Sequence, residues 1–129
     1  MSIPLTITSE KQGKKKKIVE KILIDSGAGG KFIDKNYAKA QGFELTLLPE
    51  PIWVFNVDGT LNKKGTIKHY VNLKLTIHGW KQTTQLLVTG LGKQKIILGL
   101  QWLQKHNPDI DWKKGTLKLR KPRKPQNLL

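Results

Sequence analysis

The chain contains no cysteine among its 129 residues. That absence excludes disulfides, zinc sites built on thiolates and a thiol nucleophile, and it is compatible with a reducing compartment. Long apolar runs are also missing, since none approaches the roughly 20 residues that span a bilayer. Residues 1–6 lack the charged and apolar regions of a signal peptide. We therefore expect a cytoplasmic protein without a membrane partner.

Acidic residues are scarce in this chain. There are 9 Asp and Glu residues against 24 Lys and Arg, so the net charge is +15 at pH 7 and the pI is about 10.1. Much of the basic charge sits in three runs, Lys14–Lys17, Lys113–Lys114 and Arg120–Pro125. Such a balance favours polyanion partners, although no aromatic residues interleave with the runs for base stacking. Two interpretations stay open: weak nucleic-acid binding through the basic runs, or lysines that only keep the surface soluble.

Metal-binding patterns are missing as well. The three histidines, at 69, 78 and 106, are scattered without the spacing of metal ligands. Asp109 and Asp111 could mimic a carboxylate pair, but they more simply shape a loop and a strand end. We therefore expect no metal site and no cofactor. The four tryptophans are expected in core or dimer packing; they are Trp53, Trp80, Trp102 and Trp112.

Apolar residues alternate with polar ones in short segments, which predicts an all-β, barrel-like fold. The length fits one domain, which we place at residues 1–119, followed by a basic flexible tail at 120–129. A turn is predicted over Ser9–Lys17, and Pro49-Glu50-Pro51 predicts a break between two strands. The expected extended segments are 3–7, 18–24, 31–33, 43–48, 52–57, 66–77, 80–88, 95–98, 110–112 and 116–119.

Two short helices complete the expected fold. Asp34 is placed to cap a helix that runs to about Gln41, where Gly42 provides a stop signal. A second helix is expected from Gly99 to His106. Because proline cannot continue a helix, the Asn-Pro pair after it marks its end.

The most informative motif follows the apolar residues 22–24. There an acid, a hydroxyl, a glycine and a small residue stand in a row: Asp25, Ser26, Gly27 and Ala28. An acid at the end of a buried strand is costly unless it is solvated, paired or used. Gly27 permits a tight turn and Ser26 can hydrogen-bond behind the carboxylate. The pattern is the Asp-Ser/Thr-Gly signature of an aspartic protease, and its alternative is an ordinary Asx-type turn.

Another informative element is Ile96–Leu100. Its apolar residues and glycine precede the second helix and can pack beside the Asp25 loop, where Gly99 allows a close backbone approach. Without Asp25, an ordinary junction between a strand and a helix explains the same residues.

Taken in order, these segments resemble the retropepsin family, and most of all the proteases of Ty3/Gypsy-class LTR retrotransposons. The likeness runs from about Ile22 to about Leu119. Four blocks carry it: Ile24–Ala28, Phe55–Thr60, Ile96–Leu103 and Asn107–Trp112. The first block matches the active-site loop, and the Phe55–Thr60 block resembles the flap. The third matches the hydrophobic-Gly strand with its helix, and the fourth resembles the block after that helix.

The resemblance implies a closed all-β barrel with one short helix in its C-terminal half, assembled as a homodimer. Asp25 is then the catalytic acid of an aspartic endopeptidase, and two copies of it form the dyad. Ser26 braces the two loops, Gly27 offers its carbonyl to the substrate, and Ala28 supports the loop. The flap spans about Val54 to Ile67.

An extended polypeptide is the implied substrate, cut from a retrotransposon polyprotein in the cytoplasm or in virus-like particles. The residues implied to contact it are Gly27, Gly29, Gly30, Asp58, Gly59, Thr60 and Ile97.

One departure from the family pattern follows Ala28. The family usually has Thr, Ser or Asp next, whereas this chain has Gly29 and then Gly30. The missing side chain commonly supports the loop or touches the substrate backbone. This departure motivates one alternative to the protease hypothesis, a catalytically weak or inactive peptide-binding or dimerisation module of the same fold. The net charge of +15 motivates another, a basic nucleic-acid-binding domain.

Overall fold

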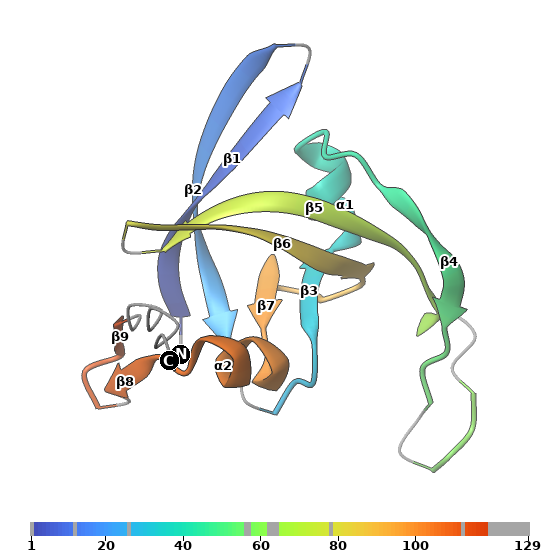
Figure 1. Cartoon of the computed structure of the whole chain (residues 1–129). Helices are drawn as coiled ribbons and strands as arrows, with labels where there is room; N and C mark the ends of the chain where they lie inside the picture. The colour runs from blue at the N-terminus through green and yellow to red at the C-terminus, as the bar shows by residue number, and fades with distance from the viewer. Residues whose placement is uncertain are drawn as a thin grey trace, which may run out of the picture.

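Seven strands form one sheet that closes on itself. The computed structural model describes residues 2–11, 13–25, 27–55, 58–61, 65–77, 79–111 and 113–118. The strand order is β1-β2-β7-β3-β6-β5-β4, and because β1 also pairs with β5, all of these strands except β4 close into a barrel (Figure 1). The strands are β1 (Ser2–Lys11), β2 (Lys14–Ile24), β3 (Lys31–Asp34), β4 (Thr46–Ile52), β5 (Ile67–Ile77), β6 (Trp80–Thr89) and β7 (Ile96–Leu98).

The remaining elements are two helices and a small hairpin. Helix α1 (Lys35–Ala40) follows β3 directly, and α2 (Leu100–His106) follows β7. The hairpin of β8 (Asp109–Asp111) and β9 (Thr116–Lys118) comes after α2. The all-β closed barrel is thus confirmed, as are both short helices. The tail expected at residues 120–129 lies outside the described residues.

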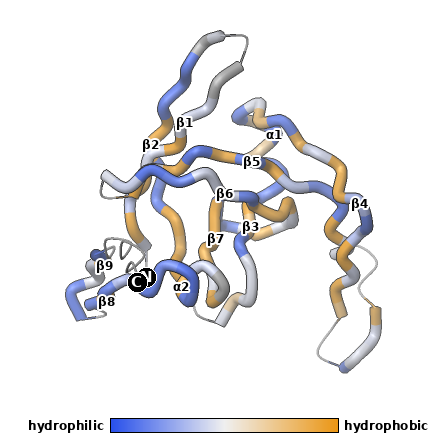
Figure 2. The backbone as a smooth tube through the Cα atoms, in the orientation of Figure 1, coloured by the Kyte–Doolittle hydropathy of each residue, from blue (hydrophilic) through white to orange (hydrophobic). Residues whose placement is uncertain are grey.

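The barrel interior holds the side chains that the alternation predicted. Along β5, every second residue from Val71 to Ile77 is buried, and the residues between them are half-buried or exposed. Trp102 of α2 is 1% exposed and packs into the same core. Figure 2 shows the apolar segments concentrated along the barrel strands, whereas the far part of β2 is hydrophilic.

The expected turn over Ser9–Lys17 is wrong. The β1–β2 ladder continues through this segment, with Ser9 opposite Lys16 and Thr8 opposite Lys17, until Lys11 pairs with Lys14. Backbone pairing needs no apolar side chains, so the two strands extend beyond the core as a polar hairpin. The chain reverses at Gly13, whose φ of +76° is one that glycine adopts without strain.

The expected break at Pro49-Glu50-Pro51 is also wrong. These residues lie inside β4, and the strand predicted at 52–57 instead ends at Ile52. β4 pairs only with β5 and is therefore an edge strand, where proline is tolerated because one side of the strand needs no N–H donors. A register shift between Leu47 and Ile52 accommodates the prolines.

Asp34 joins three parts of the fold. Its Oδ2 accepts a hydrogen bond from Tyr37 N at 3.1 Å, which caps α1 as predicted. Its Oδ1 accepts another from Leu91 N at 2.9 Å, in the loop between β6 and β7. Both carboxylate oxygens therefore hold backbone groups that belong to different elements.

We expect Asp34→Ala to lower the free energy of unfolding by about 2–3 kcal/mol, because a helix cap and a charge-assisted hydrogen bond are lost together. Urea denaturation followed by circular dichroism measures the change. Glu44→Ala removes an exposed acid nearby in the sequence and should stay within about 0.5 kcal/mol of wild type. Equal effects of the two substitutions would contradict this role of Asp34.

Candidate active site

Asp25 stands where β2 ends. Its backbone N donates to Leu98 O at 3.1 Å, so the residue is tied to the end of β7. Its carboxylate Oδ1 accepts a hydrogen bond from Gly27 N at 2.9 Å, and its carbonyl accepts one from Ala28 N at 3.1 Å. The loop is therefore an Asx-type turn, and this turn orients a half-buried carboxylate. Ser26, predicted to brace the loop, lies outside the described residues.

The loop after Asp25 is held by the segment that begins α2. Gly99 N donates to Gly30 O at 2.9 Å, and Leu100 N donates to Ala28 O at 2.6 Å. A Cβ added at Gly99 would lie 2.5 Å from Gly30 O and closer still to Ala28 O. Real Cβ atoms do not approach backbone oxygens so closely, so this contact requires glycine. The close approach predicted for Gly99 is confirmed.

Helix α2 is itself anchored to the barrel. The indole Nε1 of Trp102 donates to Gln82 Oε1 on β6 at 3.0 Å, and its ring lies 4.9 Å from the ring of His106. Burial, together with the charge of Lys105, lowers the pKa of His106 below its ordinary value. Since α2 is fixed by its core tryptophan, the Gly99 backbone is fixed too.

A row of apolar side chains lies on the same three strands. Ile97 of β7 is opposite Leu23 of β2 on one side and Phe32 of β3 on the other. All three are half-buried, whereas their apolar neighbours along the same strands are buried in the core; these are Ile22, Ile24, Ile33, Ile96 and Leu98. Asp25 comes two residues after Leu23, one residue beyond the end of β2. The alternation of the strand therefore directs its side chain to the same face as this row.

Sequence reasoning placed Ile97 near the substrate but missed Leu23 and Phe32. The signal was present in the sequence, because both are large apolar residues at positions out of phase with the buried ones. Only the pairing of β7 between β2 and β3 shows that they flank Ile97, and this pairing joins segments more than sixty residues apart.

The two glycines after Ala28 have different surroundings. A Cβ at Gly29 would meet no atom within 4 Å, and the residue is exposed. A Cβ at Gly30 would lie 3.2 Å from Cζ of Phe32, so the ring packs over that position. Gly29 therefore has room for a larger residue, whereas Gly30 has little.

The expected flap residues lie on an arm that continues from β4. Phe55 and Leu61 form an isolated β-bridge, and between them Oδ1 of Asp58 accepts hydrogen bonds from N and Oγ1 of Thr60, at 2.9 and 2.6 Å. These bonds lower the pKa of Asp58. Gly59 has a φ of +87°, as a tight turn requires.

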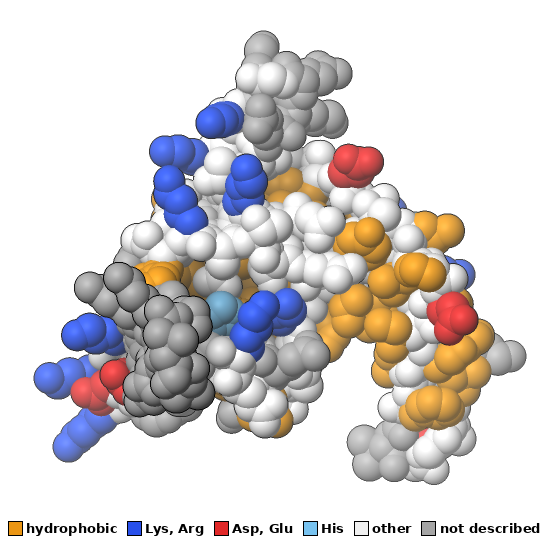
Figure 3. All heavy atoms as spheres, in the orientation of Figure 1, with side chains coloured by type: hydrophobic (Ala, Val, Ile, Leu, Met, Phe, Trp, Pro, Cys, Tyr) orange, Lys and Arg blue, Asp and Glu red, His pale blue; other side chains and the backbone are white. Residues whose placement is uncertain are grey.

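Exposed apolar side chains line both β4 and the arm, as Figure 3 shows; they are Leu47 and Ile52 of β4, with Trp53, Phe55 and Leu61 of the arm. In Figure 1 the arm descends beside the barrel, well apart from the loop of Asp25. The described part of the expected flap thus lies away from the expected catalytic acid in the single chain.

The expectations for the tryptophans and for Asp111 are confirmed in part. Trp102 is in the core and Trp80 packs against it, whereas Trp53 is 57% exposed and does not belong to it. Oδ1 of Asp111 accepts hydrogen bonds from the backbone N of Lys113 and Lys114, which confirms its role in shaping a turn. Trp112 lies outside the described residues.

The described part of the chain holds neither a metal-ligand cluster nor a membrane-spanning helix. There, no three His, Asp or Glu side chains are placed to hold a metal ion. In the same residues, no helix has the length and apolar character to cross a membrane.

Comparison with known proteins gives a family and a fold. The family model of the PEG10/RTL1 protease domain matches residues 21–127. The retroviral protease-like domain of Ddi1 from Leishmania major superposes with a TM-score of 0.56 at 19% identity, covering 99% of this chain and 96% of that one. EIAV protease, in a complex with the inhibitor HBY-793, superposes with a TM-score of 0.53 at 15% identity, covering 81% and 86%.

Gly99 and Gly29 provide a matched test of the contact between the Asp25 loop and the start of α2. We expect Gly99→Ala to destabilise the fold by about 3 kcal/mol or more, because its methyl group would collide with two backbone carbonyls. Gly29→Ala adds the same methyl group in open space and should change stability by less than about 0.5 kcal/mol. Thermal and urea unfolding measure both. Equal losses would show that Gly99 does not carry the loop contact.

Proposed function

The chain belongs to the PEG10/RTL1 protease domain family, and we propose that it is an aspartic endopeptidase that acts as a homodimer. The observation that carries this proposal is the position of Asp25. This residue directly follows β2, two residues after Leu23, which belongs to the half-buried row with Ile97 and Phe32. An apolar row next to an oriented acid suits a peptide whose side chains lie on the row while its backbone lies at the acid.

A second copy supplies what one chain lacks. Hydrolysis by this chemistry needs two carboxyl groups, one as general base toward water and one as general acid toward the peptide carbonyl. Two full charges about 3 Å apart repel by about 5 kcal/mol at an effective dielectric constant of about 20. A pair of Asp25 side chains on a two-fold axis would therefore hold one proton between them. The ionised member activates water, and the protonated member polarises the carbonyl.

The arm after β4 fits the role of the flap. Its apolar side chains, among them Trp53 at 57% and Phe55 at 63% exposure, are uncovered in the single chain. Such surface is stabilised when a partner covers it. We propose that residues 54–67 close over an extended peptide bound between two copies, with the tip between Asp58 and Gly65, so that water is excluded from the reaction.

The open position at Gly29 favours a second candidate function. With no side chain at 29, the site has one group fewer to hold the substrate backbone, and a dimeric peptide-binding module with weak or no cleavage is the alternative. The same surface would then bind an extended polypeptide without hydrolysing it.

We expect Asp25→Asn to abolish cleavage of unstructured polypeptides at acidic to neutral pH, because an amide cannot act as the base. The assay is mass spectrometry of a peptide library after incubation with wild-type or variant protein. The fold should be retained, since Asn keeps the acceptor for Gly27 N. Analytical ultracentrifugation of both proteins at high concentration reports the dimer.

Three results separate the candidates. Cleavage by wild type alone supports the endopeptidase. Dimers of both proteins with cleavage by neither would identify the binding module. A wild-type protein that stays monomeric at every concentration would refute both proposals.

We expect Gly29→Asp to raise kcat/KM for peptide cleavage about tenfold, mainly by lowering KM. A carboxylate there gains a hydrogen bond to the substrate backbone worth at least about 1.4 kcal/mol, and its Cβ meets no atom of this chain. Steady-state kinetics on one peptide measure the change. Gly29→Ala, which adds bulk without an acceptor, is the control and should leave KM unchanged. An unchanged KM for Gly29→Asp would show that position 29 is remote from the substrate.

A further inference from the structure

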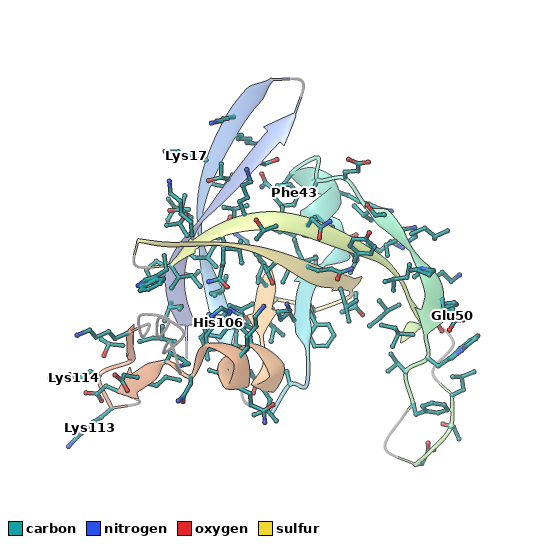
Figure 4. The ribbon with its side chains drawn as sticks, in the orientation of Figure 1. Lys17, Phe43, Glu50, His106, Lys113 and Lys114 are labelled. Carbon is teal, nitrogen blue, oxygen red and sulfur yellow. The ribbon has the colours of Figure 1, made fainter. Side chains whose placement is uncertain are left out.

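The outer face of the β1–β2 hairpin carries a row of exposed lysines. Lys15, Lys17 and Lys21 alternate with residues of the opposite face, and Val19 stands among them with 72% of its surface exposed. Because alternate residues of a strand share a face, neighbours in this row are about 7 Å apart. Figure 3 shows lysines gathered over the hairpin, and Figure 4 shows Lys17 pointing away from the barrel.

A hollow lies at the foot of this row. It has a volume of about 470 Å³, and Val19 and Lys21 line it together with Pro4, Lys93 and Lys95. Its acid, Glu20, is already paired with Lys95 at 3.0 Å. The hollow therefore combines a small apolar floor with lysines whose charge exceeds that of the carboxylate.

The side chains that the structure describes on this face are basic or uncharged. On the inner face of the hairpin, Ile22 and Ile24 are buried in the core, so the lysines on the outer face have no role in the barrel interior. Among the outer-face side chains that the structure describes on β1 and β2, none is acidic. Glu10 stands opposite Lys15 in the register, at the far end of the row.

We propose that this face binds single-stranded nucleic acid, with phosphates along Lys15, Lys17 and Lys21 and a base over Val19 and Pro4. The lysine spacing is comparable to that of successive phosphates along an extended polynucleotide. An acidic peptide would match the charge, but its carboxylates carry no flat apolar face for Val19 and Pro4, whereas every nucleotide carries a base. A single row also contacts one strand, whereas a duplex presents phosphates across a groove.

The proposed nucleic-acid site does not involve Asp25, and it can be tested without measuring peptide cleavage. Phosphate contacts release counterions, so the affinity falls with salt by about 0.7 log units per contact and per tenfold change in salt concentration for a single strand. Asp25 makes no such contact, and Asp25→Asn should bind nucleic acid as wild type does. Failure of this proposal would therefore leave the endopeptidase proposal untouched.

The experiment compares two variants of equal charge. Lys17→Gln with Lys21→Gln removes two lysines from the row, and Lys113→Gln with Lys114→Gln removes two exposed lysines from the turn between β8 and β9. Fluorescence anisotropy of a labelled oligouridine of about 15 nucleotides measures the affinity between about 50 and 200 mM salt. Thermal unfolding checks that both variants fold.

The row variant should bind about 20-fold more weakly than wild type near 0.1 M salt, with a salt slope reduced by about 1.4, because two contacts are lost. The turn variant should keep nearly the wild-type affinity. Equal losses in both variants would mean that net charge alone attracts the RNA and would overturn the proposal. Equal affinity for duplex RNA, or displacement by an equal concentration of polyglutamate, would overturn the assignment to a single strand.

Discussion

The contact between the loop after Asp25 and the backbone of Gly99 is the constraint on which the site depends. Two hydrogen bonds, from the N atoms of Gly99 and Leu100, hold the carbonyls of Gly30 and Ala28. They form only because residue 99 has no side chain. The other end of the contact is fixed by α2, whose tryptophan is buried in the core. The stability of the barrel is thereby transmitted to the position of one carboxylate.

A second constraint follows from the proposed chemistry, which needs two carboxyl groups where the chain offers one. The chain offers one oriented acid, one apolar row and one arm whose hydrophobic side chains are uncovered. In a monomer the apolar side chains of the arm are exposed to water, which is unfavourable. A lone carboxylate also lacks the second carboxyl group that would act as general acid. A two-fold axis through the Asp25 loop would bring two carboxylates together and would also place a second chain beside the apolar row and the arm. The proposal of a dimer therefore rests on the single carboxylate and on the uncovered apolar surface of the monomer.

The sequence predicted the features that depend on local chemistry. Asp34 as a cap, Gly99 as a close contact and the long β5–β6 hairpin follow from residue type and alternation, and the structure has them. Prediction failed where backbone pairing overrides side-chain preference. The β1–β2 ladder continues through lysines beyond the core, where no apolar side chain is needed. The prolines of β4 lie on an edge strand, where one side of the strand needs no N–H donor. The partners of Ile97 were missed because they depend on pairing between distant segments.

The polar hairpin also explains how so basic a chain keeps an acidic centre. Charge repulsion is weak between groups separated by more than a Debye length of about 8 Å in physiological salt. Lys15 and Lys17 lie eight to ten residues before Asp25 on one extended strand, a span of roughly 26–33 Å at about 3.3 Å per residue. Extending β1 and β2 beyond the core thus places these lysines far from the carboxylate. The geometry of the Asp25 loop is therefore set by its own hydrogen bonds and not by the lysines at the end of the hairpin.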